Sequence, residues 1–143
     1  MYMDDELEYL RQKRAKDRLA EIERKRSFQG VVPLGEITFN DFISQHRFVV
    51  VDFWAEWCGP CRQVAPVIEA LSHEMAGRVS FAKCNTDEAP RITRKFNISA
   101  IPTIILFANG RMIERVTGAV PKETLRSVII RAFGFPPPDA GTL

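Results

Sequence analysis

Apolar residues in the middle of the chain follow two different patterns. Residues 48–54 form an almost unbroken apolar run, which is typical of a strand covered on both faces. Residues 59–75 place apolar side chains at three- and four-residue spacings, which predicts a helix with one buried face. These side chains are Val64, Val67, Ile68 and Leu71. A buried strand is therefore expected to lead almost directly into an amphipathic helix.

The rest of the chain continues this alternation of strands and helices. Strands are expected at residues 31–32, 78–84, 103–107 and 111–116, and helices at residues 38–45, 90–96 and 121–133. Asn109-Gly110, between the last two strands, is a strong signal for a tight hairpin. The first three strands, which are joined by helices, should run parallel, and the closing hairpin should add an antiparallel pair. The prediction is an α/β domain, with a mixed sheet of about five strands and helices on both faces.

Single residues at the ends of these segments support the assignment. Thr38 is expected to cap the N-terminus of its helix. Pro33 has no N–H group to donate, so the first strand should lie at a sheet edge. Pro66 should kink the long helix, and Gly134 should end the last one.

Residues 1–28 differ from the domain expected at residues 29–134. Residues 4–26 are dense in charge and contain neither Gly nor Pro, with acidic residues first and basic residues last. This polarity favours a helix, and a thin apolar stripe runs along it. The stripe consists of Leu7, Leu10, Leu19 and Ile22. Two interpretations stay open: a charged extension that binds nothing, or a helix for docking or dimerisation. The Pro-rich residues 135–143 are expected to form a disordered tail.

Composition narrows the class of protein. A chain of 143 residues suffices for one domain with a core. The net charge of +2 indicates no special partner, and nucleic-acid binding is not expected. The apolar runs are too short to span a bilayer, so no membrane association is expected. The acidic start lacks the apolar segment of a secretory signal, and Met1 suggests that nothing was removed. We expect a cytoplasmic protein.

Cys58 and Cys61 carry the most informative chemistry of the sequence. Two residues separate them, at the junction between the expected strand and the long helix. This spacing lets the two sulfurs form a disulfide, and the helix N-terminus would stabilise a Cys58 thiolate. Half of a structural zinc site is the alternative, but no second Cys-x-x-Cys exists and the two histidines do not follow zinc spacing, so no metal is expected. Cys84 is interpreted as a small core residue.

Asp52 interrupts the apolar strand that precedes the cysteine pair. If its carboxyl group is buried, its pKa should be raised, because burial disfavours the charged form. Such a group could accept the proton of Cys61. A carboxylate at a wet strand end is the alternative. Lys83 could pair with Asp52, or it could be an ordinary solvated lysine.

Residues 31–133 resemble a thioredoxin. The matching residues are the run from Val51 to Cys61 that ends in Trp57-Cys58-Gly59-Pro60-Cys61, then Pro66, Lys83, Ile101-Pro102-Thr103, Asn109-Gly110 and Gly118. The resemblance implies the thioredoxin fold, preceded here by an additional helix. Residues 1–28 and the Pro-rich tail fall outside it.

The resemblance also implies roles for individual residues. Cys58 would be the exposed nucleophile, Cys61 the shielded resolving thiol and Asp52 a buried base. Pro102 would be a cis-proline that places the backbone of Ile101 beside Cys58. The supporting residues would be Trp57 as an apolar contact, Gly59 and Pro60 in the reducing type of active site, Lys83, and Gly118 where a substrate chain approaches closely.

The function expected from these residues is reduction of disulfides in cytoplasmic proteins, with no bound cofactor. Its partners would be disulfide-containing substrate proteins and a thioredoxin reductase, flavin- or ferredoxin-linked, as electron donor. An interaction or scaffold protein that recruits a partner through residues 1–28 is the second hypothesis. An oxidase or isomerase of an oxidising compartment fits less well.

Overall fold

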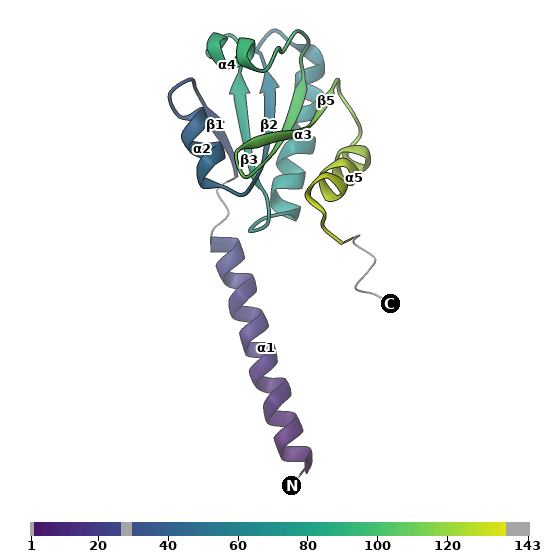
Figure 1. Cartoon of the computed structure of the whole chain (residues 1–143). Coiled ribbons are helices and arrows are strands. Elements are labelled where there is room, and N and C mark those ends of the chain that lie inside the picture. Colours follow the sequence, from purple (N-terminus) through teal and green to yellow (C-terminus); the bar gives the residue numbers. More distant parts are fainter. Residues whose placement is uncertain (1, 27–29, 137–143) are drawn as a thin grey trace.

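A five-stranded mixed sheet forms the centre of the molecule in the computed structural model, which describes residues 2–26 and 30–136 (Figure 1). In chain order the elements are α1 (Tyr2–Arg26), β1 (Val31–Leu34), α2 (Phe39–Gln45), β2 (Phe48–Trp54), α3 (Gly59–Glu74), β3 (Ser80–Asn85), α4 (Pro90–Lys95), β4 (Thr103–Ala108), β5 (Arg111–Thr117) and α5 (Lys122–Phe133). The alternation expected from the sequence is confirmed.

The strand order β1-β3-β2-β4-β5 places β2 at the centre of the sheet. Strands β1 and β2 both pair in parallel with β3, whereas β4 pairs antiparallel with β2 and with β5. Pro33 lies in the edge strand β1, as predicted. Strand β3 begins at Ser80 rather than at the predicted Arg78, because the N–H groups of Arg78 and Val79 bond back to the Met75 carbonyl in a turn.

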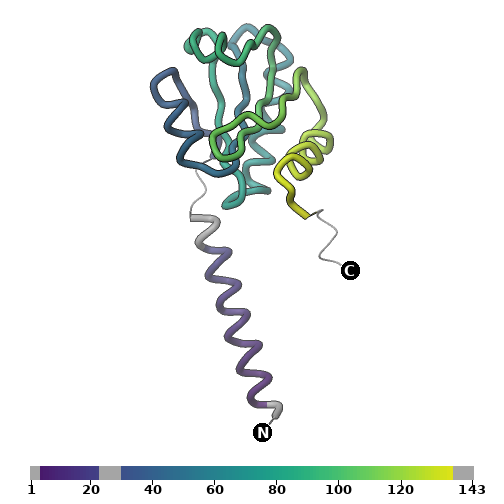
Figure 2. Tube along the Cα trace, viewed as in Figure 1, coloured from purple at the N-terminus to yellow at the C-terminus, as the bar shows by residue number. Residues whose placement is uncertain are grey.

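Two apolar layers cover the sheet, one on each face. Figure 2 traces the backbone of the strands and of the helices on either side of them. Val49, Val51 and Phe53 of β2 pack in the layer that contains α2 and α4. Val50 packs in the opposite layer, with α3 and α5. Because successive side chains of a strand point to opposite faces, Asp52 lies on the same face as Val50, beneath α3. The continuous apolar run of β2 therefore reflects burial on both faces, with Asp52 as its polar member.

Thr38 occupies the predicted N-cap position of α2, but its side chain does not cap the helix. The Thr38 backbone is already helical, and its hydroxyl oxygen accepts a hydrogen bond from the Gly35 N–H group at 3.0 Å. A backbone bond from Phe39 N–H to the Gly35 carbonyl closes the same turn. The threonine thus stabilises the turn before the helix rather than the first turn of the helix.

Helix α1 confirms the expected N-terminal helix. Every described side chain of this helix, in residues 4–22, is exposed, and Figure 1 shows α1 outside the α/β layers. The four residues of the apolar stripe are each exposed by 43% or more. No helix among the described residues is long and apolar enough to cross a membrane.

The end of α5 is set by Gly134, as predicted, in a left-handed conformation with φ of 72°. Phe135, assigned from the sequence to the disordered tail, instead packs its ring against Phe48 and Phe133. This correction has a simple cause, because an aromatic side chain directly after the helix can still reach the core. The remainder of the tail expected at residues 135–143, from residue 137 onward, lies outside the described residues.

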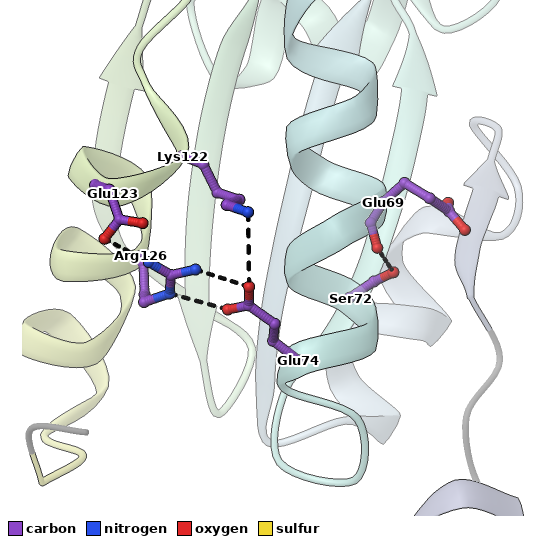
Figure 3. Close-up of polar contacts among 6 residues, drawn as sticks. All are labelled: Glu69, Ser72, Glu74, Lys122, Glu123 and Arg126. Carbon is purple, nitrogen blue, oxygen red and sulfur yellow. Dashed lines mark hydrogen bonds and ion pairs between the residues drawn. The ribbon is translucent and has the colours of Figure 1, made fainter. Parts of the chain in front are cut away.

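An ion-pair cluster joins α3 to α5, the two helices that cover the same face of the sheet (Figure 3). Arg126 donates two hydrogen bonds to the carboxylate of Glu74, at 2.9 and 2.7 Å, and also pairs with Glu123. Lys122 lies 4.0 Å from Glu74. The hydrogen bond from Arg126 lowers the pKa of Glu74. The cluster fixes the end of α3 opposite to the one that carries the cysteines.

Candidate functional site

Cys58 and Cys61 form a disulfide at the N-terminus of α3, immediately beyond the end of β2. Their Cα atoms are 5.3 Å apart, within the range that a disulfide requires. Cys58 is the N-cap residue of α3, and its Sγ atom accepts a hydrogen bond from the Cys61 N–H group at 3.2 Å. The same N–H group, together with the helix dipole, would stabilise a thiolate at Cys58 after reduction.

The two cysteines do not differ in exposure as expected. Cys58 is 4% and Cys61 3% exposed, so both are buried in the disulfide form. They differ in what they face. The Sγ atom of Cys58 lies 3.7 Å from the carbonyl oxygen of Ile101, whereas Cys61 lines a cavity that also contains Asp52. Burial of Cys58 follows from this neighbouring loop, which the sequence places 43 residues further along the chain.

Asp52 is buried in β2 beneath the disulfide, with 4% of its surface exposed. It lines a cavity of about 200 Å³ together with Cys61, Trp54 and Arg62. Burial raises the pKa of Asp52 to about 7, and the charge of Lys83 partly opposes this effect. The Oδ1 atom of Asp52 and the Nε1 atom of Trp54 are both buried without a hydrogen-bond partner among the described residues. The cavity therefore contains an acceptor and a donor that a water molecule could bridge.

Lys83 lies beside Asp52, because the two residues are paired in register between β3 and β2. Its side chain lines the same cavity, and its Nζ atom lies 5.5 Å from the centroid of the Trp54 ring. Lys83 thus acts on Asp52 as a nearby positive charge, which favours the ionised carboxylate.

The loop before β4 contributes the backbone beside Cys58. The Ile101–Pro102 peptide bond is cis, as in the proline that the resemblance implies. Gly118 donates a hydrogen bond from its N–H group to the Pro102 carbonyl at 2.8 Å, which anchors this loop to the end of β5. Gly118 has a φ of 99°, and a Cβ atom built on it would meet nothing within 4 Å. The backbone conformation of residue 118 therefore requires a glycine, whereas no other segment of the protein approaches it closely enough to do so.

Trp57 is the most exposed aromatic residue beside the disulfide, at 70%. Its indole N–H group donates a hydrogen bond to Asp87 at 3.0 Å, which fixes the ring over a groove of about 330 Å³. The groove is lined by Trp57, Thr86, Thr93, Ile98, Ser99, Ala100 and Ile101. Gly59 and Pro60 form the first turn of α3, where the missing N–H group of a proline has no cost.

Two residues of this site escaped the sequence analysis. Trp54 follows Asp52 by two positions in the same strand, so the alternation of strand side chains would have placed both on one face. Asp87, by contrast, lies 30 residues beyond Trp57 in the loop after β3, and no local pattern relates them.

The third cysteine lies away from the pair. Cys84 is fully buried in the layer that contains α2 and α4, in agreement with its interpretation as a core residue. Burial, followed by the charges of Glu36 and Glu88, raises the pKa of its thiol to about 11. Across residues 2–26 and 30–136, no group of three or more potential metal ligands comes together.

Comparison with known proteins gives a consistent result. The family model of thioredoxin matches residues 30–131. Over 100 residues the chain is 45% identical to an M-type chloroplastic thioredoxin of Spinacia oleracea, covering 69% of this chain and 55% of that protein. It is 46% identical over 89 residues to a thioredoxin of Synechocystis, covering 62% of this chain and 83% of the relative.

A solved structure shows the same fold. The structure of a mutant thioredoxin from Halobacterium salinarum superposes with a TM-score of 0.71 at 29% identity, covering 78% of this chain and 97% of that one. The present chain spans about half the length of the Spinacia relative, and 47% of a chloroplastic thioredoxin from Oryza sativa to which it is 51% identical over 81 residues. In both relatives, then, about half of the protein lies outside the matched region.

Proposed function

The chain belongs to the thioredoxin family, and on that premise we propose that it is a thiol-disulfide oxidoreductase that reduces disulfides in other proteins. The observation that carries this proposal is the Cys58–Cys61 disulfide at the N-terminus of α3. A disulfide at this position alternates between oxidised and dithiol forms. The scaffold alternative is not favoured, since the redox pair is intact.

In the proposed reaction, the reduced protein attacks first through Cys58. Its thiolate, accepting the Cys61 N–H hydrogen bond, attacks one sulfur of the substrate disulfide. A mixed disulfide forms, and the other substrate sulfur leaves as a thiolate that takes a proton from water. The backbone of Ile101 and the groove beneath Trp57 lie next to Cys58 and are proposed to hold the substrate segment.

Cys61 completes the reaction. Asp52 accepts the proton of the Cys61 thiol, directly or through a water molecule in the cavity that both line. The Cys61 thiolate then attacks Cys58, which releases the second substrate thiolate and restores the Cys58–Cys61 disulfide. Two electrons have passed to the substrate. A pKa of about 7 suits Asp52 to this task, because a base works best when its pKa lies near the working pH.

The remaining assignments are proposals of the same kind. Gly59 and Pro60 form the first turn of α3, and Gly118 stabilises the Pro102 loop through its hydrogen bond. The charge of Lys83 lowers the pKa of Asp52. A thioredoxin reductase is the proposed electron donor. We assign the catalytic domain to residues 29–134 and propose that it works in a reducing compartment. The cytoplasmic location stays a prediction, since relatives from Spinacia and Oryza are named as chloroplastic. Association through residues 1–28 also stays a prediction.

Insulin reduction with dithiothreitol as electron source tests the proposal. Cys58→Ser should abolish the acceleration of insulin precipitation, because it removes the attacking sulfur. Cys84→Ser is the matched control: it makes the same change at a buried cysteine outside the pair and should leave turnover intact. Turnover by the Cys58→Ser protein at the wild-type rate would refute the mechanism.

A further inference from the structure

A second cavity lies at the end of the sheet opposite to the cysteine pair. Its volume is about 380 Å³, compared with about 200 Å³ for the cavity beneath the disulfide. It is formed where β2 and β3 begin, by residues 45–48 and 76–81, whereas Cys58 follows the end of β2. The seven residues of β2 separate the two ends by about 20 Å, at about 3.3 Å per residue. The proposed redox reaction makes no use of this cavity.

Positive charge dominates the polar lining of the cavity. Arg47, Arg78 and His46 line it, and none of the described residues that line it is acidic. Neither arginine forms an ion pair with another described residue. His46 donates a hydrogen bond from Nδ1 to the Phe42 carbonyl at 2.8 Å, which orients the ring. Two arginines that line one cavity without an ion pair favour an anion with several oxygens, above all a phosphate.

The cavity is also larger than a single phosphate requires, and its lining includes apolar side chains beside the uncharged Gln45, Ser72 and Ser80. Phe42 and Phe81 are buried core residues, and Phe48 is half-buried under the Arg47 guanidinium, whose central carbon lies 4.8 Å from the ring centroid. Val32, Ala76 and Val79 complete this part. The volume falls within the range of about 300–1,000 Å³ that is usual for sites of small organic ligands.

We propose that this cavity is a binding site for a small organic phosphate. The phosphate binds the guanidinium groups of Arg47 and Arg78, and the organic part contacts the half-buried Phe48 side chain. Because the site is at the far end of the sheet, its occupation leaves the groove beside Cys58 open. The protein would then bind its ligand and its disulfide substrate at the same time.

Amide resonances in a two-dimensional NMR spectrum test the proposal directly. The full chain is titrated at constant ionic strength with phenyl phosphate, inorganic phosphate and phenol. Phenyl phosphate should shift the resonances of Gly77, Arg78 and Ser80 saturably, and should bind at least tenfold more tightly than inorganic phosphate. Phenol should cause no saturable shift. Equal affinity for phenyl phosphate and inorganic phosphate would overturn the proposal, since it would indicate an adventitious ion only.

Two variants identify the residues responsible. The double variant Arg47→Ala/Arg78→Ala should lose at least tenfold in affinity for phenyl phosphate, with an otherwise native spectrum and unchanged insulin reduction. Arg111→Ala, which removes an exposed arginine from β5, should bind as the wild type does. An equal loss in Arg111→Ala would show non-specific attraction and refute the site. A dimer that only the double variant dissociates would also refute it, by identifying a second copy as the occupant.

Discussion

Replacing Asp52 with Asn should stabilise the oxidised protein at pH 8 and change its stability little at pH 4. Asn resembles the protonated carboxyl group in size, but it cannot become charged. The pKa of Asp52 is raised from 3.8 to about 7 in the folded protein, chiefly by burial. Above pH 4 the unfolded chain therefore loses this proton readily, whereas the folded protein retains it until about pH 7. The protonated Asp52 therefore contributes fully to the free energy of unfolding below pH 4, and this contribution is lost as the pH rises through about 7.

The size of the effect follows from the same two values. A pKa change from 3.8 to about 7 lowers the free energy of unfolding of the wild-type protein by about 4 kcal/mol between low and high pH. Asp52 is 4% exposed, so little of this contribution is screened by solvent. Lys83, the neighbouring charge, is itself exposed and remains solvated when the carboxylate is removed. The gain in the free energy of unfolding for Asp52→Asn should therefore grow by up to about 4 kcal/mol from pH 4 to pH 8.

Urea denaturation of the oxidised protein at pH 4, 6 and 8 measures this growth. Asp17→Asn makes the same chemical change at an exposed position of α1 and serves as the control. It should show no comparable growth with pH. If the difference between Asp52→Asn and the wild type is the same at pH 4 and pH 8, the buried-acid reasoning is wrong.

Three further predictions concern the framework of the site. Arg126→Ala should lower the free energy of unfolding by about 1 kcal/mol, because its two hydrogen bonds to Glu74 are lost (Figure 3). Lys122→Ala should lower the free energy of unfolding by less, and thermal denaturation compares the two variants. Cys84→Ser should destabilise the domain by about 1–3 kcal/mol in urea titrations, since it buries a hydroxyl group in an apolar layer. Insulin reduction by this variant should continue. Loss of turnover in the folded variant would contradict a purely structural role for Cys84. Removing residues 1–26 should leave insulin turnover nearly unchanged, because the described side chains of α1 are all exposed; a collapse of turnover would assign that helix to the domain or the site.

Much of the fold could be predicted because local patterns and packing agree. The apolar run of β2, the helical spacing of α3 and the Asn109-Gly110 turn each specify one element and its place in the sheet. Whether Asp52 is buried could not be decided from the strand pattern alone, because a carboxylate at a wet strand end was also compatible with it; the folded structure buries the residue. The redox pair was evident from the spacing of its two cysteines.

Features that depend on contacts between distant segments could not be predicted in the same way. Thr38 was expected to cap α2, but its hydroxyl oxygen accepts a hydrogen bond from Gly35 in the preceding turn. Cys58 was expected to be exposed, but the Ile101 loop covers it. Arg47 and Arg78 belong to two separate loops, and only the folded sheet makes them line the same cavity.

In the proposed mechanism, Cys58 attacks substrate disulfides and Cys61 resolves the mixed disulfide. Trapping with Cys61→Ser tests it most directly, because this variant retains the nucleophile and lacks the thiol that releases the substrate. The reduced variant is incubated with a disulfide-containing protein, and the adducts are digested and analysed by mass spectrometry without reductant. Mixed disulfides through Cys58 that dithiothreitol dissociates are expected. Adducts through Cys84, or no adducts under conditions in which the wild type reduces the same substrate, would contradict this mechanism.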